Sequence, residues 1–107
     1  MERYHVKITD AALADMDDIY SYIAQKLGSA INAGRQYDRI AQEILELEQM
    51  PERFPVMGDP LGDEFGLRRM PVDNYSVFYV VRGGEVIVTD VLYSASDIEA
   101  RLAERHE

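Results

Sequence analysis

The residues best suited to bind a charged partner are three arginines in the second half of the sequence, Arg68, Arg69 and Arg82. Between positions 67 and 82, three arginines stand against one acidic residue, Asp73, a local charge of +2 in a chain whose total is −9. A guanidinium group binds a carboxylate or a phosphate through two parallel hydrogen bonds. The same arginines could instead pair with the chain's surplus carboxylates as surface ion pairs, which add little stability.

Two tyrosines accompany this basic segment, Tyr75 within it and Tyr93 after it. A tyrosine hydroxyl can donate a hydrogen bond or act as an acid, but on a strand it more often packs with its hydroxyl at the rim. The candidates for binding a partner or target are therefore Arg68, Arg69, Tyr75, Arg82 and Tyr93. The candidates for catalysis are fewer, Arg68, Arg82 and Tyr93, and no reaction is assigned to them.

The acidic and histidine residues predict no metal site. Asp15 and Asp18 could reach one divalent ion, but acids near a helix N-terminus more commonly offset the helix dipole. We therefore expect Asp15, Asp17 and Asp18 on the solvent side of a helix. His5 is expected on the sheet surface and His106 in a frayed tail. The chain has no cysteine, which excludes disulfides and thiolate metal ligands, and no cofactor is predicted.

Length and charge limit the classes of protein. A chain of 107 residues fits one domain and leaves no room for two. Its 20 acidic and 11 basic residues are unlike the broad basic face of a nucleic-acid binder or a protein docked on anionic lipid. No apolar run approaches membrane-spanning length, and the first ten residues lack a signal-peptide core. We expect a single domain over residues 1–107, in the cytoplasm and without membrane contact.

Apolar spacing predicts one strand and two helices in the first half of the chain. Alternation over residues 4–9 is typical of a strand, followed by an N-cap at Thr9 or Asp10. The first helix is expected to end at Gly28 and to bury Leu13, Met16, Tyr20, Ile23 and Leu27. The second, capped by Ser29 and stopped by Pro51, is expected to bury Ala33, Tyr37, Ile40, Ile44 and Leu47. The short connection predicts an antiparallel helical hairpin.

The second half of the chain predicts three strands and a short helix. After an irregular stretch over residues 50–66, strands are expected at 67–72, 75–82 and 86–93, with a hairpin at Gly83-Gly84. A final helix at 97–104, capped by Ser94 or Ser96, is expected at one end of the sheet. The order β-α-α-β-β-β-α predicts an α+β fold in which the helical hairpin covers one face of a small, mostly antiparallel sheet. The other face is expected to be partly open.

This order, with the residues that fill it, resembles the RelE/ParE toxins of bacterial type II toxin–antitoxin modules, also known as plasmid-stabilisation toxins. The resemblance rests on four segments that together cover nearly the whole chain: AALADMDDIYSYIA, LEQMPERFP, LRRMPVDNYSVFYVV and VTDVLYSASDIEARL. The family often has a P-x-R-x-P-like segment after the second helix. It also often has an arginine-rich strand that leads to Y-x-V-F-Y.

The resemblance implies a small toxin held inactive by an antitoxin that wraps around it. RelE-like members cleave mRNA in the ribosomal A site, whereas ParE-like members poison DNA gyrase. Ser76 stands where many of the nucleases carry an arginine, Tyr93 where some carry a histidine, and Ser94 where some carry a catalytic tyrosine. Residues 94–96 also lack the arginines that many members have there. These departures favour the ParE-like branch over the ribosome and mRNA as target.

We therefore expect a ParE-like toxin that binds and poisons an essential target, most plausibly DNA gyrase, and that forms a complex with its cognate antitoxin. Two alternatives stay open. One is a RelE-like, metal-independent endoribonuclease with displaced catalytic groups. The other is a non-toxic remnant that only binds antitoxin. In the complex, an antitoxin helix is expected beside the helical hairpin, with an extended segment along the sheet edge or over the arginines.

Overall fold

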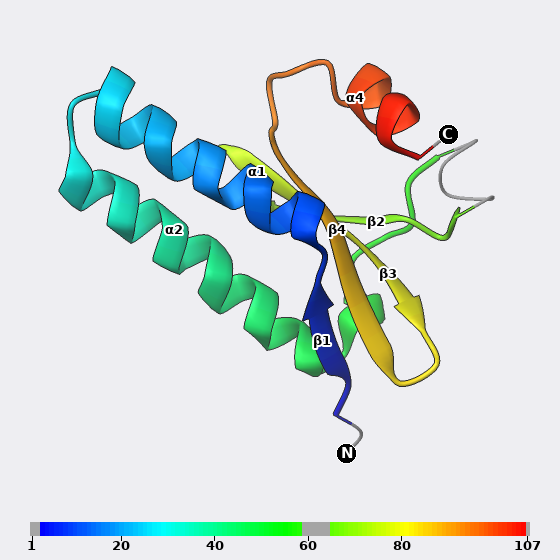
Figure 1. Cartoon of the computed structure of the whole chain (residues 1–107). Coiled ribbons are helices and arrows are strands. Elements are labelled where there is room, and N and C mark those ends of the chain that lie inside the picture. Colours follow the sequence, from blue (N-terminus) through cyan, green and yellow to red (C-terminus); the bar gives the residue numbers. More distant parts are fainter. Residues whose placement is uncertain (1–2, 59–64, 107) are drawn as a thin grey trace.

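The computed structural model describes residues 3–58 and 65–106, and its elements follow the predicted order (Figure 1). The strands are β1 His5–Ile8, β2 Arg68–Val72, β3 Tyr75–Arg82 and β4 Glu85–Tyr93. The helices are α1 Asp10–Ser21, the π-helical turn Tyr22–Lys26, α2 Ala30–Leu45, the 3-10 turns Glu46–Glu48 and Pro51–Arg53, and α4 Ile98–Arg105. This order of elements confirms the α+β fold with a helical hairpin.

Among the described residues, no helix is both long and apolar enough to span a bilayer.

The four strands form one mixed sheet in the order β1-β4-β3-β2. β1 runs parallel to β4, and the other two pairings are antiparallel. Because β2 is an edge strand, it tolerates Pro71, which has no backbone N–H to donate to a second neighbour. Phe78 pairs with Asp90 and Tyr79 pairs with Val88, so Thr89 is an extra residue that forms a β-bulge.

The two helices of the hairpin begin and end for local reasons that the sequence predicts. The Thr9 hydroxyl accepts a hydrogen bond from the Ala12 N–H at 3.1 Å, and the Ser29 hydroxyl accepts one from the Asn32 N–H at 3.2 Å. Both are N-caps that satisfy a free amide of the first turn. Gly28 has a φ of 68°, the left-handed conformation in which glycine commonly ends a helix.

The predicted buried stripe of α1 is wrong in part. Met16 and Ile23 are buried, but Leu13, Tyr20 and Leu27 are exposed by 40%, 40% and 62%. The helix instead turns Ala12, Asp15 and Met16 inward, and the Asp15 carboxylate forms an ion pair described below. For α2 and the turn after it, the prediction holds better. Tyr37 is half-buried, and the other four expected residues are fully buried: Ala33, Ile40, Ile44 and Leu47.

The sheet has an apolar layer on both faces. The first lies under the helical hairpin and includes Met16, Ile40, Val77, Tyr79 and Val88. The second lies under α4 and consists of Leu67, Phe78, Val80, Leu92, Ile98 and Leu102. Figure 1 shows α4 on the side of the sheet away from α1 and α2. Ile98 and Leu102 bring α4 onto part of that face, while His5 and Lys7 of β1 stay exposed on it, so the second face is partly open as expected.

Two smaller expectations about the second half also change. The cap of α4 is Asp97, whose carboxylate accepts from the Ala100 N–H at 3.3 Å, and not Ser94 or Ser96. In the predicted loop, Phe54 and Met57 pack against the two apolar layers, and Val56 forms an isolated bridge with Arg68. The predicted anchor Leu61 lies outside the described residues.

Candidate functional site

The three arginines of the basic segment lie in different surroundings and do not form one binding face. Arg68 donates to the carbonyl oxygens of Phe54 at 2.6 Å and of Glu52 at 3.3 Å, and its side chain is 18% exposed. Arg82, at the far end of β3, donates to the carbonyl oxygens of Phe65 and Val81. Both guanidinium groups therefore hold neighbouring backbone.

Arg69 lies on the face of the sheet that α4 covers, as the opposite directions of neighbouring strand residues require. Its Nε donates to the hydroxyl of Ser76 at 2.9 Å, and its guanidinium lies 5.8 Å from the centre of the Phe78 ring. Ser76 is fully buried, and its hydroxyl is 2.8 Å from that of Ser94. Neither terminal nitrogen of the Arg69 guanidinium forms a hydrogen bond with a described residue. Both nitrogens are therefore available to bind an anionic group of a partner.

Tyr75 and Tyr93 come together where β3 begins and β4 ends. Their ring centres lie 5.8 Å apart at an interplanar angle of 61°, and Tyr93 is 52% exposed. Burial raises the pKa of Tyr75 above its ordinary value, and Tyr93 and Tyr22 add to the effect.

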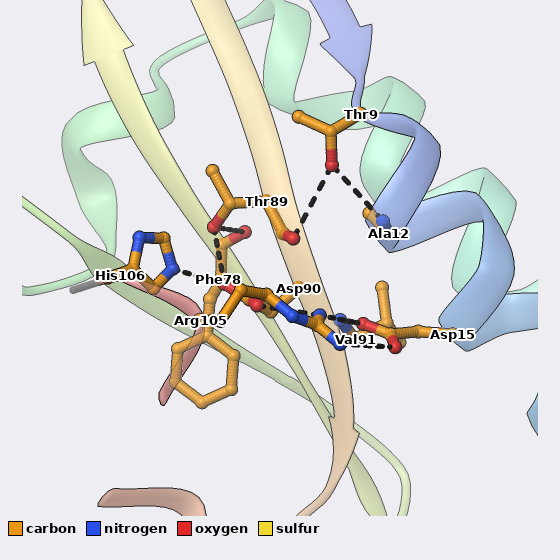
Figure 2. A network of polar contacts seen from close by, with 9 residues as sticks. All are labelled: Thr9, Ala12, Asp15, Phe78, Thr89, Asp90, Val91, Arg105 and His106. Atoms are coloured by element: carbon orange, nitrogen blue, oxygen red, sulfur yellow. Dashed lines mark hydrogen bonds and ion pairs between the residues drawn. The ribbon is translucent and has the colours of Figure 1, made fainter. Parts of the chain in front are cut away.

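A partly buried ionic network that the sequence did not suggest joins α1, β4 and α4 (Figure 2). Arg105 donates to both carboxylate oxygens of Asp15, at 2.6 and 3.1 Å, and to Asp90 at 2.8 Å. The other oxygen of Asp90 lies 2.6 Å from the Thr89 hydroxyl and 2.8 Å from His106 Nε2. The hydrogen bond to Asp15, followed by that to Asp90, raises the pKa of Arg105 further above its ordinary value.

This network corrects two expectations. Asp15 is not on the wet face of α1, because its carboxylate also accepts the Val91 N–H at 2.9 Å. The last residue pair between β1 and β4 is Ile8 with Val88, so β1 offers no carbonyl oxygen to the Val91 N–H. The Asp15 carboxylate accepts that N–H instead. His106 is not in a frayed tail, because its ring contacts Asp90. The sequence signal for this network was an acidic residue inside a mainly apolar segment, Asp15 in AALADM and Asp90 in VIVTDVLY.

The network anchors α4 on the sheet through Asp15 and Asp90. Asp90 is fully buried, and within the part of the chain that is described no group of three or more His, Cys, Asp or Glu side chains could hold a metal ion. Of the predicted site residues, Arg69, with its terminal nitrogens unbonded to any described residue, and Tyr93, which is 52% exposed, can contact another molecule.

Residues 6–98 match the family model described as "ParE toxin of type II toxin-antitoxin system, parDE". The chain belongs to the ParE toxin family. This ParE-family toxin is thus part of a type II toxin–antitoxin system, which confirms the RelE/ParE resemblance and implies an antitoxin partner. The matched range ends at Ile98, before Arg105 and His106 of the ionic network.

A solved structure supports the ParE-like fold. The chain is similar to one described as "Chromosomal ParDE TA system from P. aeruginosa", with a TM-score of 0.70 and 20% sequence identity. The similarity covers 85% of this chain and 96% of the other. At that identity it concerns the fold alone. No curated protein sequence matches the chain.

Proposed function

We propose that this ParE-family toxin acts in the cytoplasm by binding and poisoning an essential enzyme, DNA gyrase, and that a cognate antitoxin neutralises it. The observation that carries the proposal is the family match over residues 6–98. ParE-like toxins act by binding, so the proposal requires an accessible contact surface and no reaction centre.

The surroundings of the nuclease-branch positions support this choice. Cleavage of RNA without a metal needs a base, an acid and cations around one phosphate. Ser76, which stands where many of the nucleases carry an arginine, is fully buried, and its hydroxyl is hydrogen-bonded to Arg69 and Ser94. Arg68 and Arg82, two of the candidates for catalysis, donate to backbone carbonyls of neighbouring segments. These contacts favour binding over cleavage as the mode of action.

The order in which synthesis stops in induced cells tests the target. We expect thymidine incorporation to fall before leucine incorporation, because a poisoned gyrase stalls replication directly. With purified gyrase, the toxin should increase covalent gyrase–DNA complexes, and co-expression of the cognate antitoxin should restore growth.

Other outcomes would select an alternative. Earlier loss of leucine incorporation, with new A-site cuts in primer extension, would overturn the gyrase target in favour of mRNA cleavage. Unchanged growth without antitoxin would indicate a remnant that keeps only the fold and antitoxin binding.

A further inference from the structure

A pocket of about 320 Å³ opens between the two helices of the hairpin, at the solvent surface. Asp17 and Tyr20 from α1, and Gly34, Tyr37 and Asp38 from α2, line it. The two helices lie side by side (Figure 1), and the pocket is separate from the strands that carry the basic segment.

Gly34 leaves room in this pocket that the described chain does not use. It lies in the interior of α2, where glycine is less favourable than alanine. A Cβ atom built at Gly34 would have no described atom within 4 Å, apart from its helix and chain neighbours. No packing inside the described chain therefore requires a glycine here, and the space is open to a group from outside.

The pocket combines two carboxylates with two aromatic rings. Tyr20 and Tyr37 meet edge to face, with their ring centres 6.4 Å apart at 84°. Asp17 and Asp38 are exposed, and neither forms an ion pair with another described residue. Two carboxylates beside tyrosine rings are complementary to a guanidinium group, which has five donors and stacks on aromatic faces.

Exposed apolar side chains continue the helix faces that line the pocket. Leu13 is four residues before Asp17 on α1 and is 40% exposed. Ile31 is three residues before Gly34 on α2 and is 71% exposed. Since side chains three or four residues apart lie on one side of a helix, the pocket is flanked by apolar surface. An amphipathic helix with one arginine among apolar residues would match this pattern.

We propose that the pocket receives an arginine side chain from an amphipathic helix of the antitoxin. The inference rests on the proposed neutralisation by an antitoxin and names the chemistry of one contact in that complex. The guanidinium would lie between Asp17 and Asp38, against the tyrosine rings and in the room left by Gly34.

Charge-neutralising variants test the contact, with the cognate antitoxin as the probe. The double variant Asp17→Asn/Asp38→Asn should weaken the complex at least about tenfold and reduce its salt dependence. Asp18→Asn is the matched control, because Asp18 is exposed on α1 and does not line the pocket. Its affinity should change by less than about twofold.

Two further measurements separate a pocket contact from general electrostatics. Gly34→Leu should leave the thermal midpoint unchanged or raise it, because leucine favours helices, while the filled pocket lowers antitoxin affinity. Each antitoxin arginine is also replaced by alanine. One of these changes should weaken binding to the wild-type toxin but not to the double variant, which identifies the arginine in the pocket.

The outcomes distinguish this inference from the proposed function. If co-expressed antitoxin fails to restore growth, the neutralisation fails and the pocket assignment fails with it. If growth is restored but the double variant binds as tightly as Asp18→Asn, only the pocket assignment is overturned. A dimer of free toxin that the two asparagine changes dissociate would also overturn it, by assigning the pocket to a second copy of the chain.

Discussion

Arg105, on the last turn of α4, donates to the Asp15 carboxylate of α1 at 2.6 Å, although the two residues are 90 positions apart in the sequence. The same guanidinium binds Asp90 of β4, so one cation joins the two helices to the strand between them. α4 has eight residues and buries only Ile98 and Leu102. Its position on the sheet therefore depends on the ionic contacts as well as on apolar burial.

The first prediction concerns this anchor. Arg105→Ala leaves Asp15 and Asp90 buried without their cation, so we expect a loss of about 2–3 kcal/mol of unfolding free energy. Urea unfolding would measure it. Arg101→Ala is the matched control, because Arg101 is exposed on the same helix. Equal unfolding midpoints for the two variants would show that the network does not stabilise the docked helix.

The local parts of the fold could be predicted from the sequence, whereas the network could not. The caps at Thr9 and Ser29 and the turn at Gly28 follow from neighbouring residues, so local reading finds them. Strict alternation along β4 would place Asp90 with Val88 under the hairpin. The extra residue at Thr89 reverses this order, and strand alternation does not reveal such a bulge.

The arrangement of the candidate residues could not be predicted from the sequence. Tyr75 lies opposite Tyr93 because the bulge at Thr89 shifts the β3–β4 pairing by one residue, whereas the register set by the Gly83-Gly84 hairpin alone would pair Tyr75 with Leu92. The contacts of Arg68 and Arg82 with backbone carbonyls depend on where the preceding irregular segment folds, and no local pattern specifies that. The three arginines are close in the sequence, but in the structure they do not share one site.

The second prediction separates the roles of two adjacent arginines. Arg69→Glu should lower antitoxin affinity by about tenfold, because it reverses the charge of a guanidinium whose terminal nitrogens have no bonded partner among the described residues. Arg68→Glu should instead lower the thermal midpoint, because Arg68 holds the Phe54 carbonyl. Calorimetric titration and thermal melts of both variants measure the two effects. A stable Arg68→Glu protein with wild-type melting would contradict the assignment for Arg68.

The third prediction concerns the N-cap of α2. Ser29→Ala removes the hydroxyl that accepts the Asn32 N–H, so we expect a loss of about 1 kcal/mol of unfolding free energy. Ser21→Ala is the comparison, because Ser21 makes no side-chain cap bond with the described residues. Urea unfolding curves with unchanged slopes would give both values. A loss of the same size in both variants would contradict a specific capping role.

The last prediction is a dependence of stability on alkaline pH. Tyr79 is fully buried, and burial raises its pKa from the ordinary 10.0 to about 12. The neutral hydroxyl donates to the Pro51 carbonyl. Because the unfolded chain releases this proton first, the contribution of Tyr79 is complete below pH 10 and is lost as the pH rises to about 12.

Tyr79→Phe isolates this contribution from the other tyrosines, because phenylalanine has no proton to release. Between pH 10 and 12, wild-type unfolding free energy should fall by about 2 kcal/mol more than that of Tyr79→Phe. Urea unfolding of both proteins across that range measures the difference. At pH 7 the variant should be destabilised by about 1 kcal/mol, the value of one hydrogen bond. Parallel pH profiles would contradict a buried, protonated Tyr79 that holds the segment after α2 against the sheet.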